Sequence, residues 1–121
     1  MDSKNSDDDW RVICEKDDLA ESELKEFYVS EVSILLVRLS DRIFACQGIC
    51  PHMDEPLSHG FIDGTLLTCS KHLWQWNLET GAPVGLAEME LSVLPVKVDA
   101  TRVLVNINQL TNGGGACTQE F

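Results

Sequence analysis

Apolar and polar residues alternate along much of this chain with the period of two that is typical of β-strands. The alternation is clearest near the C-terminal end, where residues 94–99 and 102–107 both show it around a turn at Asp99–Thr101. This pattern predicts a β-hairpin. A second hairpin is predicted by the β-rich segment Val32–Leu39, which a short turn separates from Ile43–Cys46.

Shorter strands are expected at Trp10–Glu15, Leu66–Thr68 and Leu73–Trp76. The residues on one side of the first alternation are Trp10, Val12 and Cys14. Asp17–Glu26 fits either a helix capped by an aspartate or a turn that leads into a strand at Leu24–Val29. We favour the turn and strand.

Many short strands, with no long amphipathic helix and no internal repeat, indicate an all-β sandwich or barrel. The 121 residues are enough for one domain with a modest core. We expect a disordered acidic N-terminus at 1–9, a folded domain at 10–108 and a flexible tail at 109–121. The segment from about 48 to 85 is expected to be a small subdomain inserted between strands of a larger body.

The charge balance limits the possible partners. Twenty acidic residues against nine basic ones give a net charge of −11, which argues against binding to nucleic acid or to an anionic membrane surface. The longest apolar stretch, Ile34–Val37, is too short to cross a bilayer, and the N-terminus lacks the pattern of a signal peptide. We therefore expect a cytoplasmic protein. Its acidity indicates either simple solubility or electrostatic steering toward a basic partner surface.

Five cysteines are an awkward number for a disulfide framework, and a reducing cytosol would leave them free. Cys14 and Cys46 lie in apolar runs and are expected to be small core residues. Cys117 lies in the glycine-rich tail, where we expect no specific role. Cys50 and Cys69 remain as candidate metal ligands.

The strongest chemical signal is a pair of short motifs, Cys50-Pro51-His52 and Cys69-Ser70-Lys71-His72, separated by sixteen residues. Each motif supplies one thiol and one imidazole, so the four side chains can converge on one inorganic centre. A Cys₂His₂ set can hold structural zinc. The same set, with one Cys and one His in each loop, is also the ligand arrangement of a Rieske [2Fe–2S] centre.

The ligand types determine the charge of such a cluster. Two ferric ions, two sulfides and two thiolates sum to zero, whereas four thiolates would leave a charge of −2. An electron is added more easily to a neutral centre, so histidine ligation raises the potential. Rieske centres accordingly span about −150 to +300 mV, against about −400 mV for plant-type ferredoxins.

Several further motifs accompany these ligands in order, and together they resemble the Rieske-type ferredoxins. The resemblance covers most of residues 10–108 and is strongest across 50–83. The segments that carry it are Cys50-Pro51-His52, Leu57-Ser58-His59-Gly60, Gly64-Thr65-Leu66-Leu67-Thr68-Cys69, His72-Leu73-Trp74-Gln75-Trp76-Asn77 and Thr80-Gly81-Ala82-Pro83.

The resemblance implies a β-sandwich body that carries a smaller cluster-binding subdomain. It implies that Cys50 and Cys69 bind the inner iron, and that His52 and His72 bind the outer iron near the surface. It also implies that the stretch Gly81–Pro83 corresponds to a proline-containing loop that covers the cluster.

The family also implies a role as an electron carrier rather than an enzyme. The partners would be a flavin-containing NAD(P)H reductase and an oxygenase, and we expect a monomer. The sequence His72-Leu73-Trp74 is closer to ferredoxins of diiron aromatic or alkene monooxygenases than to those of ring-hydroxylating dioxygenases. The alternatives are a small subunit of an assimilatory nitrite reductase and a structural zinc module.

The chain also departs from the high-potential Rieske proteins of respiratory complexes. Those proteins have an additional cysteine in each ligand loop, where this chain has Asp54 or Glu55 and Ser70. They also have hydroxyl donors after the second histidine, where this chain has Leu73–Gln75. Fewer hydrogen bonds to sulfur predict a lower potential, although Ser70 can still supply one hydroxyl.

The side chains around the ligands have simpler expected roles. Asp54 and Glu55 are expected to be solvated loop acids, His59 a turn residue and Lys71 an exposed lysine. Trp74 and Trp76 would share one face of a regular strand, so we expect both to be at least partly buried.

Overall fold

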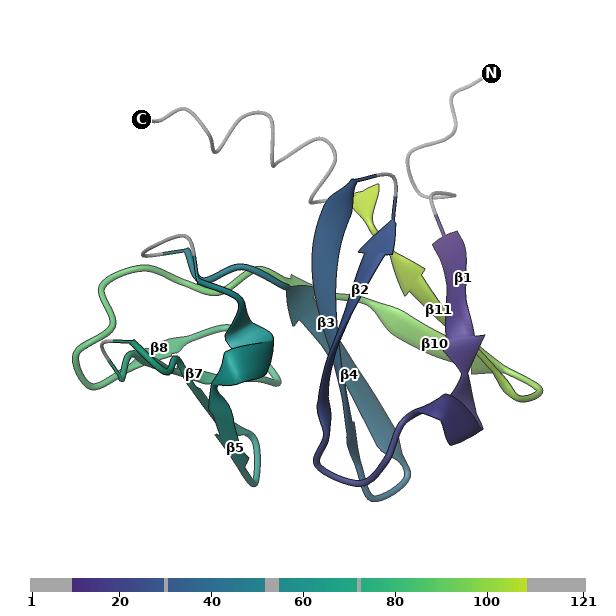
Figure 1. The fold of residues 1–121 in the computed structure, drawn as a ribbon, viewed down its shortest axis with the longest axis horizontal. Helices are drawn as coiled ribbons and strands as arrows, with labels where there is room; N and C mark the ends of the chain where they lie inside the picture. Colours follow the sequence, from purple (N-terminus) through teal and green to yellow (C-terminus); the bar gives the residue numbers. More distant parts are fainter. Residues whose placement is uncertain (1–9, 30, 52–54, 72, 109–121) are drawn as a thin grey trace.

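The computed structural model describes residues 10–29, 31–51, 55–71 and 73–108 (Figure 1). The expected termini at 1–9 and 109–121 lie outside the described residues. The strands are Trp10–Glu15 (β1), Leu24–Val29 (β2), Val32–Leu39 (β3), Arg42–Gln47 (β4), Phe61–Asp63 (β5), Leu66–Thr68 (β6), Gln75–Asn77 (β7), Pro83–Val84 (β8), Val93–Leu94 (β9), Val96–Asp99 (β10) and Arg102–Asn106 (β11). Two 3₁₀ helices cover Lys16–Asp18 (η2) and Leu57–His59 (η3).

Three antiparallel sheets build an all-β fold, which confirms the predicted class. The body contains a three-stranded sheet in the order β1-β11-β10 and a four-stranded sheet in the order β2-β3-β4-β9. A smaller sheet has the order β5-β6-β7-β8 and lies to the left of the body in Figure 1. The chain leaves the body after β4 and returns at β9, which pairs with β4. No helix among the described residues is long and apolar enough to cross a membrane.

Strand β3 separates two apolar cores. Its four central residues, Ile34–Val37, are fully buried, so both faces of the strand are covered. Ile34 and Leu36 pack into the body core, between the two sheets of the body. Leu35 and Val37 point the other way, as residues one position apart in a strand must. They pack into a second core, here called the joint core, which the body shares with the smaller sheet.

The joint core contains both cysteines of the predicted metal site. Its buried members are Leu35, Val37, Cys46, Cys50, Leu57, Leu67, Cys69, Trp74, Trp76, Leu78 and Leu91. Burial of one large apolar side chain contributes about 1.5–3 kcal/mol, so this core holds the smaller sheet firmly against β3 and β4. Only glycine fits at position 48, where the chain leaves β4, because a side chain there would clash with Ser33 on β3.

Most predicted strands are confirmed. These include β1, the β3–β4 hairpin, the β10–β11 hairpin, and the turn and strand favoured for residues 17–29. Cys46 is buried and Cys14 is partly buried, in line with their expected core positions.

One strand departs from regular alternation, and two details of the strand prediction are wrong. The register of β1 against β11 shifts between Val12 and Cys14, and Val12 is exposed while Cys14 is partly buried. Such a bulge inserts one residue and breaks the period of two. The predicted strand at 94–99 is two strands, because β9 ends at Leu94 and pairs with β4, whereas β10 pairs with β11. The strand expected at Leu73–Trp76 begins only at Gln75, because Leu73 has a φ of +61°. The sequence patterns also missed β5 and β8, which have three and two residues.

Truncation of β3 on either face should destabilise the protein to a similar degree. Leu35→Ala and Leu36→Ala should each lower the free energy of unfolding by about 2–5 kcal/mol, because each leaves a cavity in a filled core. The matched control is Val98→Ala on β10, where the residue is 44% exposed and the expected loss is below about 1 kcal/mol. Urea denaturation measures all three. A Leu35→Ala loss no larger than that of the control would contradict the joint core.

Candidate metal centre

Cys50 and Cys69 come from different parts of the chain and both lie in the joint core. Cys50 follows β4 and Cys69 directly follows β6. The exposed fractions of the two residues are 3% and 0%, and neither forms a disulfide. Two cysteine thiols outside any disulfide, in one water-poor apolar cluster, form a site that suits a soft-ligand metal centre.

Hydrogen bonds of the same kind close both ligand loops. The backbone N–H of Cys50 donates to the carbonyl oxygen of Glu55 at 2.9 Å, and the N–H of Cys69 donates to the carbonyl oxygen of Trp74 at 2.8 Å. In each case the acceptor lies five residues after the cysteine. Each hydrogen bond therefore fixes the two ends of its loop relative to each other. In the sequence, the predicted histidine lies between these two ends.

His52 and His72, the two predicted nitrogen ligands, lie outside the described residues. Within the part of the chain that is described, no three His, Cys, Asp or Glu side chains gather where they could hold a metal ion. The structure thus places the two predicted sulfur ligands in the same apolar core, and their role as ligands, like the complete four-residue set, stays a prediction. The described half fits the group, because an iron–sulfur cluster needs soft thiolate donors shielded from water.

The second loop bends sharply just after His72. Leu73 has a φ of +61°, which is rare for a bulky side chain, and it is largely exposed. Backbone strain of this kind persists where the surroundings fix it, and it concentrates at functional sites. The bend returns the chain to the joint core at Trp74.

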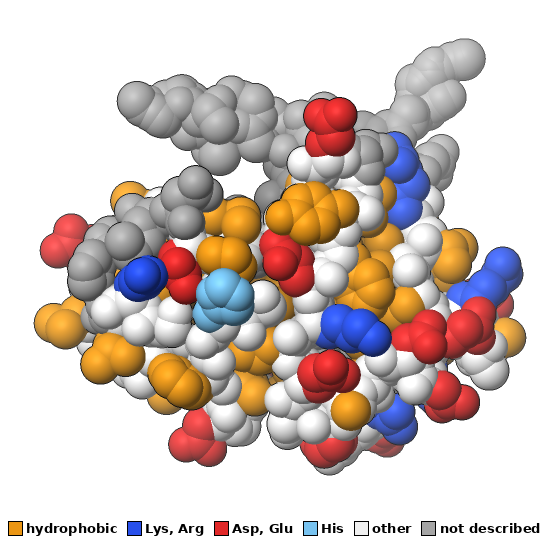
Figure 2. All heavy atoms as spheres, in the orientation of Figure 1, with side chains coloured by type: hydrophobic (Ala, Val, Ile, Leu, Met, Phe, Trp, Pro, Cys, Tyr) orange, Lys and Arg blue, Asp and Glu red, His pale blue; other side chains and the backbone are white. Residues whose placement is uncertain are grey.

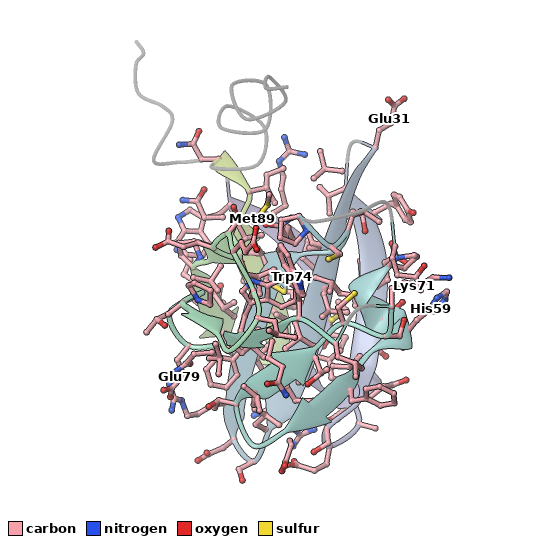
Figure 3. The ribbon with its side chains drawn as sticks, turned by 90° about the vertical axis from the view of Figure 1, so that its left-hand side faces the viewer. Glu31, His59, Lys71, Trp74, Glu79 and Met89 are labelled. Carbon is pink, nitrogen blue, oxygen red and sulfur yellow. The ribbon has the colours of Figure 1, made fainter. Side chains whose placement is uncertain are left out.

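The two tryptophans are buried as expected, but not because they share a strand. Trp74 precedes β7 and Trp76 lies within it, and their rings meet edge to face with centroids 6.3 Å apart. The indole N–H of Trp76 donates to the carbonyl oxygen of Met89 at 2.8 Å. Figure 3 shows Trp74 in the interior, below Met89.

The stretch Gly81–Pro83 is tied to the segment that follows it. Gly81 has a φ of +82°, and its carbonyl oxygen accepts the N–H of Leu91 at 2.9 Å. A side chain at position 81 would clash with the Leu91 carbonyl oxygen. Pro83 begins β8, which pairs with β7. Its predicted role as a cover over a cluster stays a prediction.

Glu55 differs from the solvated loop acid that we expected. Only 14% of its side chain is exposed, and its Oε2 atom accepts the Ser70 hydroxyl at 3.1 Å. The same oxygen lies 3.1 Å from Nδ1 of His59, which ends η3 and so occupies the turn position predicted for it. Lys71 is exposed, as expected. Asp54 lies outside the described residues.

The surroundings of Glu55 favour its charged form. The hydrogen bond with His59 lowers the pKa of the Glu55 carboxyl, and Ser70 and the positive charge of Lys71 lower the pKa further, although partial burial opposes them. A lowered pKa means that the stabilising contribution of the carboxylate is complete at neutral pH. It is lost only as the pH falls through the lowered pKa.

The link between Glu55 and Ser70 was missed by sequence reasoning. The two residues are fifteen positions apart, and no periodicity or motif connects them. The available signal was their placement, because each lies close to one of the two candidate cysteines. The sequence left open that Ser70 supplies a hydroxyl to sulfur, and in the structure this hydroxyl donates to Glu55.

Comparison with known proteins adds independent support. The family model for the Rieske [2Fe-2S] domain matches residues 9–98. The ferredoxin component of the alkene monooxygenase system of Xanthobacter autotrophicus is 35% identical over 116 residues, which are 94% of this chain and 94% of that protein. The methanesulfonate monooxygenase ferredoxin subunit of Methylosulfonomonas methylovora is 33% identical over 99 residues, which are 81% of this chain and 80% of that protein.

Solved structures show the same fold. The ferredoxin of carbazole 1,9a-dioxygenase from Nocardioides aromaticivorans superimposes with a TM-score of 0.75 at 25% identity, over 79% of this chain and 95% of that chain. These matches agree with the two buried thiols and favour iron–sulfur chemistry over a structural zinc module. The chain belongs to the Rieske [2Fe-2S] domain family, as an electron-carrying ferredoxin with one Rieske-type cluster.

Proposed function

We propose that this ferredoxin accepts one electron from a flavin-containing NAD(P)H reductase and delivers it to the oxygenase component of a monooxygenase system. The observation that carries this proposal is the match over 94% of both chains with an alkene monooxygenase ferredoxin, together with the match to a methanesulfonate monooxygenase ferredoxin. The match to a dioxygenase ferredoxin has lower sequence identity. A role as a monomeric shuttle is the simplest one for a single small domain.

We propose that Cys50 and Cys69 bind the inner iron and that His52 and His72 bind the outer iron. The burial of both thiols in the joint core supports the deep position of the first iron. Leu73, the neighbour of His72, is largely exposed, which supports a surface position for the second. When bound, such a cluster accepts and releases one electron.

The acidic surface supports electrostatically guided docking. The net charge is −11, and acidic side chains are spread over the face shown in Figure 2. A weak, short-lived encounter with a basic partner surface gains speed from such a field. Rapid exchange of partners is what a carrier between two proteins requires.

The ligand assignment predicts different outcomes for the three histidines of the chain. His72→Ala and His52→Ala should each abolish the Rieske EPR signal and lower the iron and acid-labile sulfide content. His59→Ala is the matched control and should keep the signal, because its ring faces Glu55. An unchanged Rieske spectrum in His72→Ala would remove His72 from the site.

The partner assignment is tested by stopped-flow reoxidation of the reduced ferredoxin. Reoxidation should be faster with a diiron monooxygenase component than with a ring-hydroxylating dioxygenase component. If acidity guides docking, the rate should also fall with added salt, roughly tenfold at the low end of known steering effects. Equal rates with both oxygenases would contradict the monooxygenase assignment, and a rate independent of salt would leave solubility as the role of the charge.

A further inference from the structure

Glu55 is hydrogen-bonded to both ligand loops. Its backbone carbonyl oxygen accepts the N–H of Cys50 at 2.9 Å, within the first loop. Its carboxylate accepts the hydroxyl of Ser70 at 3.1 Å, and Ser70 directly follows Cys69 in the second loop. One residue therefore connects the segment that holds one sulfur ligand to the segment that holds the other.

The surroundings of this carboxylate show which of its contacts matters. His59 is 64% exposed at its side chain, and an ion pair with such a partner in water contributes little. Figure 3 shows His59 and Lys71 close together at one edge of the molecule, on the opposite side from Glu79. The bond to Ser70 is partly buried and joins two segments fifteen residues apart. This bond restricts the movement of one loop against the other.

The same bond determines where the Ser70 hydroxyl points. A serine hydroxyl carries one proton and can donate it to one strong acceptor. Because the Ser70 hydroxyl donates its hydrogen bond to Glu55, it is not available to donate one to a sulfur of the cluster. Hydrogen bonds to cluster sulfurs are one of the factors that tune the potential of iron–sulfur centres. Ser70 is therefore withheld from the role that its position next to Cys69 would suggest.

The charge of Glu55 favours a lower cluster potential, as does the loss of a hydrogen bond from Ser70 to sulfur. A glutamate carboxyl is ordinarily ionised at neutral pH, so Glu55 carries a fixed negative charge next to the two ligand loops. A negative charge beside a centre that gains an electron opposes that gain, because like charges repel, and the repulsion is stronger where water is partly excluded.

We propose that Glu55 is a positioning residue that fastens the two ligand loops to each other and holds the cluster at a lower potential. The proposal rests on the ligand assignment given above. It combines two effects of one side chain, a hydrogen-bonded bridge through Ser70 and a fixed negative charge. These two effects can be separated by substitution.

Glu55→Gln removes the charge and keeps an amide oxygen that can accept the Ser70 hydroxyl. Its midpoint potential, measured by redox titration, should shift to a more positive value while the Rieske EPR signal is retained. The matched control is Glu79→Gln, the same chemical change at an exposed residue that pairs with Arg42. The control should shift the potential much less. A Glu55→Gln shift no larger than that of Glu79→Gln would overturn the role of the charge.

Ser70→Ala removes the bridge and keeps the charge. The visible absorption of this variant should bleach several-fold faster than that of the wild type when an iron chelator is added. Its potential should stay close to the wild-type value. Bleaching at the wild-type rate would overturn the bridge, and a clearly lower potential would show that the hydroxyl reaches a sulfur after all. This variant decides the bridge even if Glu55→Gln fails to assemble.

Failure of the ligand assignment and failure of the Glu55 proposal give different experimental results. A wild-type protein without a Rieske EPR signal would refute the ligand assignment and, with it, the basis of the proposal. Variants that show the signal but have wild-type potentials and bleaching rates would refute only the role of Glu55.

Discussion

Burial of β3 on both faces is the constraint on which the rest of the structure depends. Residues 34–37 are fully buried because one face supports the body core and the other supports the joint core. The smaller sheet has strands of only two or three residues, too short to form a stable unit without support. Its apolar side chains are covered because the outer face of β3 and β4 lies against them.

The position of the sulfur ligands follows from this arrangement. Cys50 and Cys69 are members of the joint core, so the packing that attaches the smaller sheet also places both thiols in one buried region. Their loops are each closed by a hydrogen bond from the cysteine N–H, and they are joined to each other through Glu55 and Ser70. Metal binding contributes to folding free energy when the ligands are held in this way. Fold stability and cluster retention should therefore be linked.

The sequence predicted the features that depend on local patterns. The apolar run at 34–37, the two long hairpins and the ligand motifs all lie within short stretches of chain, and the structure confirms the strands among them. The exposure of Val12 could not be predicted, because a bulge depends on the partner strand. The bend at Leu73 has no sequence signal either, since a bulky residue rarely adopts a positive φ.

In the candidate site too, features carried by short sequence motifs were predicted, whereas contacts between residues distant in the sequence were not. Both candidate cysteines lie in one apolar core, and their residue types and spacing predict the metal chemistry, whereas the four-ligand set stays a prediction. The contact between Glu55 and Ser70 connects loops from different parts of the smaller subdomain, and it exists only once the joint core has formed. Residues that tune a metal centre through such contacts are visible only in three dimensions.

The most direct test of the central claim is pulsed EPR of the chemically reduced protein. If two thiolates and two imidazoles hold one [2Fe–2S] cluster, the spectrum should show couplings to two histidine nitrogens on one iron. Couplings to no histidine nitrogen, or a protein that contains zinc and neither iron nor acid-labile sulfide, would contradict the claim.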